Sequence, residues 1–279
     1  MTLAIIILAI AVVLLSLLLI ASRGRYLKLK TSLEQGQITM YDKLKDSEED
    51  KVRLKRQLTQ NVAHELKTPV SSIQGYLETL VNDTTLDEET RESFIKRCYS
   101  QSQRLSALVQ DISTLNKLDD APQSYEKEPV NVASVLQTIA KDTDLQLKEH
   151  KIRFMPLIAP DVNVLGDHSL IYSIFRNLTD NSIAYAGDES TITVQVLKEN
   201  ENEYQFLFAD NGAGLPAEHL PHLFERFYRV DKGRSRKLGG TGLGLAIVKN
   251  SVLLHHGTIA ARIGKTGGLE FIFTLPKVK

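Results

Sequence analysis

Residues 240–244 read Gly240-Thr241-Gly242-Leu243-Gly244, and this stretch decides the fold expected for the second half of the 279-residue chain. An apolar run over residues 243–255 follows it, with the length and composition of a buried helix. Backbone N–H groups at the start of a helix bind phosphate, and glycine lets the backbone approach such a ligand closely. The stretch therefore predicts a phosphate cradle in front of a helix.

A second glycine-rich stretch, Asp210-Asn211-Gly212-Ala213-Gly214, follows the strand-like run of residues 204–209. The carboxylate of Asp210 can accept a hydrogen bond from an adenine amino group, while Gly212 and Gly214 let the backbone approach a ligand. Taken alone, the stretch is equally typical of an ordinary turn.

Two asparagines, Asn177 and Asn181, lie four residues apart in a predicted helix and so share one side of it. They border an apolar face that consists of Leu170, Ile174 and Leu178. Mg²⁺ takes oxygen ligands and is often held by a few protein groups together with substrate phosphates, which an amide oxygen permits. The pair predicts the edge of a cleft, although two solvated amides would show the same spacing.

Aromatic and basic residues lie between the two glycine stretches. Phe224-Glu225-Arg226-Phe227-Tyr228-Arg229 is followed by a Lys- and Arg-rich segment over residues 231–237. Because basic side chains here could screen a triphosphate, we interpret the segment as a mobile lid. A charged loop that is merely solvated is the alternative.

The pattern around these motifs alternates between helix and strand. Helical runs lie near residues 131–149, 167–186 and 243–255, and strand-like runs lie near residues 125–130, 151–158, 161–165, 190–198, 203–210, 257–264 and 268–275. Such alternation predicts a mixed α/β layer fold, an α/β sandwich, for residues 121–279.

Residues 51–120 show a purely helical pattern. Apolar residues recur at steps of three and four in a first helix, at Leu54, Leu58, Val62, Leu66, Val70, Ile73, Leu77 and Leu80. Turn residues follow, with Thr85 and Glu88 at the spacing of a capping box. A second apolar stripe then consists of Phe94, Cys98, Leu105, Leu108, Ile112, Leu115 and Leu118. The pattern predicts an amphipathic helical hairpin.

Two helices alone bury such long stripes poorly. Pairing with a second copy would complete a four-helix bundle, so we expect a homodimer. Cys98, the single cysteine, falls within the second stripe and is interpreted as a small core residue.

His64 lies between Val62 and Leu66 of the first stripe, and on a helix this position faces away from the apolar seam. A neutral imidazole has a nitrogen lone pair that can attack phosphorus, and the carboxylate of Glu65 could hold the other N–H or accept its proton. A solvated surface histidine beside a glutamate is the alternative. Only the whole set of motifs, in this order, points to ATP-dependent phosphorylation of a histidine.

The first residues differ in kind from the rest. Residues 3–21 contain no charged residue, and the run is close to the roughly 20 residues that a helix needs to span a bilayer core. Positive charges follow it, at Arg23, Arg25, Lys28 and Lys30. The sequence predicts a single-pass transmembrane helix in the inner membrane, with Met1 outside, a connector over residues 22–50 and the catalytic part in the cytoplasm.

The charge balance argues against one class of partner. Lys plus Arg and Asp plus Glu each number 34, so no net charge attracts the chain to nucleic acid. The sequence also lacks a basic helix with interleaved aromatic residues. No nucleic-acid partner is therefore expected.

Over residues 51–279 the chain closely resembles the membrane sensor histidine kinases of bacterial two-component systems, and it is phosphate-sensor-like among them. His64-Glu65-Leu66-Lys67-Thr68-Pro69 looks like their phosphoacceptor box, residues 177–181 like their asparagine box, the two glycine stretches like their glycine boxes and residues 224–227 like their phenylalanine box. The resemblance implies a dimerisation and histidine phosphotransfer domain over residues 51–120 and a GHKL-type catalytic ATP-binding domain over residues 121–279.

By this resemblance, His64 accepts the γ-phosphoryl group of ATP, while Glu65 and Thr68 assist phosphotransfer and phosphatase chemistry. Asn181 binds Mg²⁺, and Asp210 reads adenine. The other nucleotide contacts that the resemblance implies are Asn177, Tyr185, Gly212, Gly214, Phe224, Arg229, Gly240, Thr241, Gly242, Leu243 and Gly244. The phosphoryl group would then pass to an aspartate in the receiver domain of a response regulator.

Two positions depart from the usual pattern of that family. Members often carry Ala one residue after the second asparagine and Lys or Arg three residues after it, where this chain has Ser182 and Ala184. One possible phosphate contact is therefore absent.

We accordingly expect a dimeric, membrane-anchored protein histidine kinase that uses ATP and Mg²⁺. One alternative is a noncatalytic dimeric signalling scaffold that binds ATP. Another is a nucleotide-driven ATPase of the gyrase and chaperone type, which would share the pocket but has no use for an exposed histidine on a preceding hairpin.

Overall fold

The computed structural model describes residues 59–120, 125–230, 240–265 and 267–278. The chain divides into two compact units, Met1–Val62 and Ala63–Lys279, and the fold described below is that of the second. The transmembrane helix expected over residues 3–21 and the connector expected over residues 22–50 lie outside the described residues. Within the described ranges, no helix combines the length and the apolar character that crossing a membrane requires.

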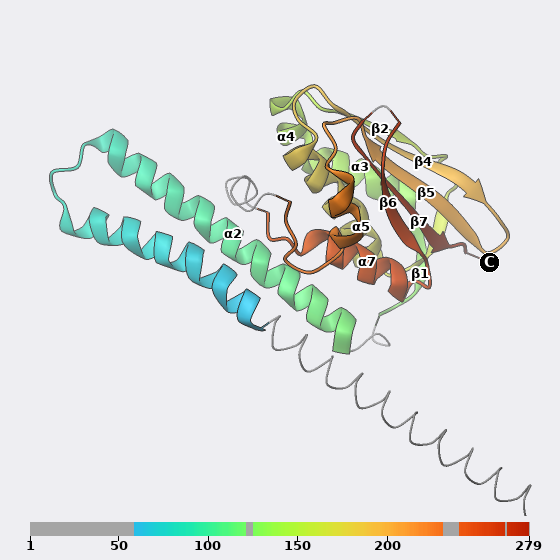
Figure 1. Cartoon of the computed structure of the whole chain (residues 1–279), viewed down its shortest axis with the longest axis horizontal. Helices are drawn as coiled ribbons and strands as arrows, with labels where there is room; N and C mark the ends of the chain where they lie inside the picture. Colours follow the sequence, from blue (N-terminus) through green and yellow to red (C-terminus); the bar gives the residue numbers. More distant parts are fainter. Residues whose placement is uncertain (1–58, 121–124, 231–239, 266, 279) are drawn as a thin grey trace, which may run out of the picture. The chain divides into compact units, whose positions relative to one another are not determined.

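The helical hairpin is confirmed over its described part (Figure 1). A first helix covers residues 59–82 and continues through Pro69, and α2 (Glu88–Asp120) returns beside it. The rings of Tyr76 and Phe94 join the two helices, with centroids 5.2 Å apart. Cys98 is partly buried, and its thiol lies 3.9 Å from the carbonyl of Ile73, which fits a small residue of the helix seam.

The capping box expected from Thr85 and Glu88 is wrong. Helix α2 begins at Glu88, so Asp87 is the residue that directly precedes it. The carboxylate of Asp87 accepts hydrogen bonds from the Thr90 amide at 2.7 Å and from the Thr90 hydroxyl at 2.9 Å. An acidic cap also faces the positive end of the helix dipole, which favours Asp87 over the neutral Thr85.

The α/β part contains two sheets. Strands β1 (Glu128–Asn131) and β3 (Asn163–Gly166) pair antiparallel in a small two-stranded sheet. A five-stranded sheet has the order β2-β4-β5-β7-β6, in which only β2 and β4 pair parallel. Its strands are β2 (Arg153–Leu157), β4 (Thr191–Glu199), β5 (Glu203–Asp210), β6 (Ile259–Ile263) and β7 (Leu269–Pro276). All seven predicted strand-like runs are thus strands.

Helices cover one face of the large sheet (Figure 1). They are α3 (Val132–Asp142), α4 (Asp144–Glu149), α5 (His168–Tyr185) and α7 (Gly244–Leu254). The three predicted helical runs are confirmed, except that the first is divided at Thr143, whose hydroxyl donates to the carbonyl of Ile139 at 2.7 Å. The short 3-10 helix η1 (Ala217–His222) was not predicted, because it carries no apolar period.

Alternation along the strands builds the core. Strands β5 and β7 send every second side chain towards the helices, so that Phe206 and Phe273 stack with centroids 5.5 Å apart. Phe175 of α5 meets both rings edge-on. All three side chains are fully buried. This aromatic layer fixes where α5 lies across the sheet.

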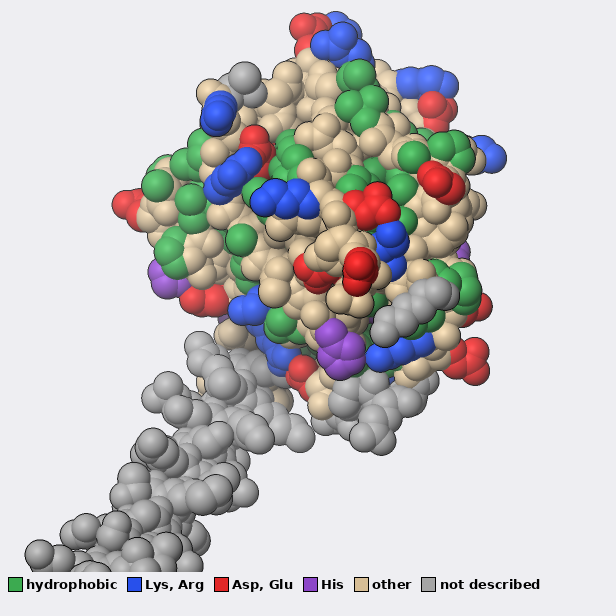
Figure 2. Space-filling model, turned by 90° about the vertical axis from the view of Figure 1, so that its right-hand side faces the viewer, with side chains coloured by type: hydrophobic (Ala, Val, Ile, Leu, Met, Phe, Trp, Pro, Cys, Tyr) green, Lys and Arg blue, Asp and Glu red, His purple; other side chains and the backbone are tan. Residues whose placement is uncertain are grey.

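The surface of the α/β part carries both signs of charge. On the face shown in Figure 2, Lys and Arg side chains lie next to Asp and Glu. Ion pairs within this part include Lys151 with Glu189 and Lys277 with Glu199.

The second half of α2 packs against α7. Leu108, Leu115 and Leu118 are buried together with Leu243 and Ile247. The sequence alone assigned this part of the apolar stripe to pairing between helices of the bundle. In the structure it also anchors the start of α7, and with it the glycine segment of residues 240–244.

His255 joins the end of α7 to the start of α5. The buried imidazole has Nδ1 at 2.7 Å from the carbonyl of Ser251, and its Nε2 accepts a hydrogen bond from the Asp167 amide at 3.1 Å. Asp167 in turn caps α5 by accepting from the Leu170 amide at 3.0 Å. This bonding requires the neutral ring with its proton on Nδ1. Burial lowers the pKa of His255, which favours that neutral form.

We expect acid to destabilise the fold through His255. Because the folded-state pKa is lowered, the unfolded chain binds more protons as the pH falls below about 6.5, and the free energy of unfolding falls with it. The loss is at most about 1.4 kcal/mol per pH unit for one proton. Calorimetric melting of the full chain between about pH 7.5 and about pH 5.5 measures it.

His255→Gln should be less stable than the wild type at neutral pH and show a shallower fall with acid. His168→Gln changes an exposed histidine at the start of α5 and serves as the matched control. A wild-type pH dependence in His255→Gln would show that another group is responsible.

Candidate functional site

His64 lies on the exposed side of the first helix, as predicted. It borders a hollow of about 430 Å³ whose other lining residues are Lys67, Thr68, Ser71 and Ser72. The Thr68 hydroxyl donates to the carbonyl of His64 at 3.3 Å. The imidazole is therefore open to a reacting group and is surrounded by hydroxyls and one cation.

Glu65 is held by two arginines. Its Oε2 accepts from Arg229 at 3.1 Å and from Arg104 at 3.3 Å. None of the three side chains is more than 16% exposed, so these charge-assisted bonds are shielded from water. In this arrangement the carboxylate expected to assist His64 is committed to cations instead.

The glycine segment is fixed against the hairpin. The Thr241 hydroxyl donates to Oδ2 of Asp111 on α2 at 2.7 Å and accepts from the Leu243 amide at 3.1 Å. Arg229 also donates to the carbonyl of Gly240. Gly242 has a φ of 74°, a conformation that suits glycine. These contacts fix the backbone that leads into α7.

Asn177 lies directly against the start of α7. Its Nδ2 donates to the carbonyl of Ser173 at 2.8 Å and to the Ser173 hydroxyl at 3.0 Å. The side-chain oxygen faces Gly244, where an added Cβ would lie 2.6 Å away. A larger residue at this position would therefore displace the Asn177 carboxamide.

The rest of the predicted asparagine motif follows along α5. Asn181 is partly buried one turn after Asn177, and Tyr185 ends the helix with 39% of its side chain exposed. The carboxamide oxygen of Asn181 suits Mg²⁺, which prefers oxygen donors and accepts few protein ligands. The structure thus places Asn177 against the glycine segment, with Asn181 one turn further along the same helix.

The carboxylate of Asp210, at the end of β5, accepts three hydrogen bonds. Its Oδ2 accepts from the Ser182 hydroxyl at 3.0 Å, and its Oδ1 accepts from the amides of Gly212 at 3.1 Å and Leu269 at 3.3 Å. Gly268 lies so close to Asp210 that a Cβ there would collide with its backbone carbonyl and with Oδ1. The carboxylate consequently has one fixed orientation.

Gly212 and Gly214 are favoured over larger residues for different structural reasons. Gly212 passes directly over the backbone of Ala186, where a Cβ has no room. Gly214 has a φ of 67°. Gly212 thus lets the loop pass close to the end of α5, and Gly214 supplies a backbone conformation that favours glycine.

Two acidic side chains near the glycine segment were not singled out from the sequence. Burial raises the pKa of Asp111, and the charge of Asp180 raises it further, while the hydrogen bond from Thr241 acts in the opposite direction. Burial also raises the pKa of Asp180, although Arg176 binds both of its oxygens at 2.9 Å. No local sequence pattern reveals that α2 and α5 bring these carboxyl groups near each other.

The phenylalanine motif connects the sheet to the hairpin. Phe224 packs edge-on against Phe271 with centroids 6.3 Å apart. The Phe227 amide donates to the carbonyl of Gly242 at 2.7 Å. Arg226 binds both oxygens of Asp119 at the end of α2, at 2.8 and 2.9 Å. The basic segment interpreted as a lid, residues 231–237, lies outside the described residues.

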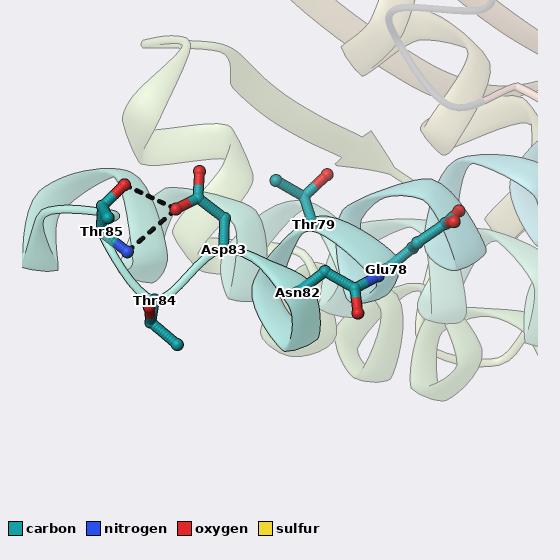
Figure 3. A pocket seen from close by; sticks show the side chains of 6 residues that line it. All are labelled: Glu78, Thr79, Asn82, Asp83, Thr84 and Thr85. Atoms are coloured by element: carbon teal, nitrogen blue, oxygen red, sulfur yellow. Dashed lines mark hydrogen bonds between the residues drawn. The ribbon is translucent and has the colours of Figure 1, made fainter.

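A second hollow, of about 450 Å³, lies at the turn of the hairpin (Figure 3). Its wall is polar, and both the amide and the hydroxyl of Thr85 donate to Oδ1 of Asp83. None of the residues predicted to take part in catalysis or nucleotide binding lines it. It has no part in the site described above.

Two family models match the chain in the order in which these features occur. Residues 54–121 match the His Kinase A (phospho-acceptor) domain, and residues 166–279 match the histidine kinase-, DNA gyrase B-, and HSP90-like ATPase. The chain belongs to the histidine kinases. The exposed His64 lies in the first matched region, and Asn177, Asp210 and the glycine segment lie in the second.

Sensor proteins of this family are similar in sequence. The phosphate regulon sensor protein PhoR of Haemophilus influenzae is 36% identical over 218 residues, and the sensor histidine kinase WalK of Bacillus subtilis is 31% identical over 238 residues. The alignments cover 78% and 85% of this histidine kinase chain and 50% and 39% of the relatives. The chain therefore spans half or less of the length of these relatives.

Solved histidine kinase structures share the fold. The histidine kinase AdeS of Acinetobacter baumannii has a TM-score of 0.61 at 24% identity, over 77% of this chain and 98% of its own. The histidine kinase ThkA, solved in complex with the response regulator protein TrrA, has a TM-score of 0.63 at 21% identity, over 80% of this chain and 61% of its own. At these identities the likeness is one of fold.

Asp111→Asn is expected to strengthen the contact between α2 and the glycine segment. Because its pKa is raised, the folded state binds more protons than the unfolded chain, so the contact weakens as the pH rises through the folded-state value. Asparagine removes the partly buried charge and still accepts from Thr241. We expect amide hydrogen exchange in residues 108–118 and 243–248 to slow by about 2- to 10-fold.

Asp119→Asn removes a charge from the exposed end of the same helix, where it pairs with Arg226, and should not slow exchange. Faster exchange in Asp111→Asn would contradict the interpretation, because it would mean that the charged carboxylate holds the segment in place.

Proposed function

We propose that the protein transfers the γ-phosphoryl group of ATP to His64 and then passes it to an aspartate of a response regulator. The observation that carries this proposal is the open imidazole of His64, next to a hollow, in a chain whose α/β part has the ATPase fold of the family. An ATPase without phosphotransfer would have no use for that imidazole.

His64 supplies the nucleophile. The neutral ring attacks phosphorus with the lone pair of one nitrogen, the bond between that nitrogen and phosphorus forms, and the bond from phosphorus to the bridging oxygen of ADP breaks. The remaining ring N–H then loses its proton. Glu65 is the adjacent carboxylate that could take this proton, once its bonds to Arg104 and Arg229 are exchanged.

The α/β part positions the nucleotide. In the proposal, Asp210 accepts from the adenine amino group, and the amides of Gly242 and Gly244 at the start of α7 face the phosphates, joined by the Leu243 amide once it exchanges the Thr241 hydroxyl for a phosphate oxygen. Mg²⁺, held by Asn181 and the phosphates, would neutralise charge that develops during transfer. Arg229 would exchange Glu65 for a phosphate oxygen, since a planar guanidinium binds either oxyanion equally well.

We further propose that the hairpin forms a four-helix bundle with a second copy. Large apolar side chains of the hairpin remain exposed in the single chain, among them Leu77 at 48%, Ile95 at 54% and Tyr99 at 66%. The match to the phospho-acceptor domain is consistent with this pairing. The apolar run of residues 3–21 supports a membrane anchor, with the catalytic part in the cytoplasm.

Incubation of the full chain with γ-labelled ATP and Mg²⁺ should label the protein through His64. A phosphorus–nitrogen bond is labile in acid and stable in alkali, which distinguishes it from a phosphoserine or a phosphothreonine. His64→Gln is expected to lower the incorporated label by at least about 100-fold. Label that moves to purified receiver domains within minutes would identify the cognate regulator.

His168→Gln, an exposed histidine of α5, is the matched control and should retain full labelling. Undiminished label in His64→Gln would refute the assignment of the phosphoacceptor. Release of free phosphate without labelled protein would favour the ATPase, and nucleotide binding without either product would favour the scaffold.

Dimerisation of the hairpin is tested with a charged substitution in its exposed apolar surface. A carboxylate in the exposed seam of the hairpin would have to be buried in the bundle, so Ile95→Glu should weaken association by at least about 10-fold. Light scattering on the detergent-solubilised full chain measures the mass. Leu145→Glu, at a residue of α4 that is 79% exposed, should leave the dimer intact. A wild-type chain that stays monomeric at high concentration would rule the bundle out.

A further inference from the structure

Ser182 is a fully buried hydroxyl that faces the nucleotide region. It lies on α5 directly after Asn181, and none of its surface is exposed. Its hydroxyl donates to Oδ2 of Asp210 at 3.0 Å. This hydrogen bond connects the last turn of α5 to the end of β5. Asp210 itself is only 8% exposed, so the bond is formed away from bulk water.

The Ser182 hydroxyl bonds to a carboxylate and not to the backbone of its own helix. A buried hydroxyl within a helix can be satisfied by the carbonyl four residues earlier, and Thr179 does this by donating to Phe175 at 2.8 Å. Ser182 instead bonds to a carboxylate on another element. Hydrogen bonds to a charged partner are stronger than those between neutral groups. The bond therefore restrains the Asp210 carboxylate as well as pairing the buried Ser182 hydroxyl.

The acceptor positions of Asp210 limit what else it can bind. A carboxylate offers about four lone-pair positions, two on each oxygen. The amides of Gly212 and Leu269 take both positions on Oδ1, and Ser182 takes one on Oδ2. One position, on Oδ2, remains for a ligand. A single N–H donor with a fixed direction fits it, whereas a carbonyl oxygen would be repelled.

We propose that Ser182 is a positioning and specificity-determining residue for the adenine base, a role that rests on the proposed ATP-dependent function. Its hydroxyl fixes the plane of the Asp210 carboxylate and leaves one acceptor position, which selects a base with an exocyclic amino group. Guanine presents an oxygen at the corresponding ring position and is rejected. Ser182 acts through Asp210 and does not take part in phosphoryl transfer.

Alanine at position 182 loosens this arrangement in two ways. The carboxylate loses the bond that fixes its plane, and Oδ2 gains a second open position that water can fill. Both effects weaken only the bond to the amino group of the base. Because alanine is smaller than serine and has a higher helix propensity, Ser182→Ala is expected to fold.

The test compares nucleotides that differ only at that amino group. Binding of ATP, purine riboside triphosphate and GTP to the full chain is measured by displacement of a fluorescent nucleotide. Purine riboside triphosphate lacks the amino group and therefore reports every contact except the one in question. Ser182→Cys keeps the size of the side chain but has a weak donor, and Thr179→Val removes another buried hydroxyl of α5 as the matched control.

Ser182→Ala and Ser182→Cys are expected to weaken ATP binding by about 3- to 10-fold, to change purine riboside triphosphate binding by less than about 2-fold and to narrow the preference for ATP over GTP. Thr179→Val should leave the ratio of the ATP and purine riboside triphosphate affinities unchanged. An equal loss for both nucleotides, or no loss for ATP, would overturn the role of Ser182. A wild-type chain that binds no ATP would overturn the proposed function itself.

Discussion

Helix α5 can bury only one of its faces, and the site depends on this constraint. Ile171, Ile174, Phe175 and Leu178 are completely buried against the sheet and its neighbouring helices. Because successive residues of an α-helix are rotated by about 100°, fixing the apolar face also fixes the directions of the other side chains. Asn177 then lies against the start of α7, and Ser182 points to Asp210. A small rotation of the helix would expose apolar surface, so packing of the core sets the orientation of the polar groups.

The same groups that could hold phosphate are engaged by carboxylates of the hairpin. Glu65 binds Arg229, and Asp111 accepts from Thr241. A phosphate oxygen and a carboxylate oxygen compete for such donors, so nucleotide binding and the contact between α2 and the glycine segment are linked. By reciprocity, the factor by which this contact weakens nucleotide binding equals the factor by which bound nucleotide weakens the contact. The buried leucines between α2 and α7 oppose the separation.

Local patterns predicted most of the fold because they are set by neighbouring residues. The period of two along β4, β5 and β7 and the period of about 3.6 along α5 follow directly from burial on one face. The polar contacts of the site escaped prediction because they join distant parts of the chain. Nothing near Asp111 in the sequence indicates Thr241, 130 residues later, as its partner. In the sequence, Ser182 is only a departure from a family pattern, because its bond to Asp210 depends on how α5 lies against β5.

The most direct test of this account is a crystal structure of the full chain with Mg²⁺ and a nonhydrolysable ATP analogue. We expect the exocyclic amino group of adenine within hydrogen-bond distance of Oδ2 of Asp210, the phosphates at the amides of residues 242–244 and the metal at Asn181. A nucleotide bound with Asp210 unengaged, or with its phosphates away from the start of α7, would contradict it.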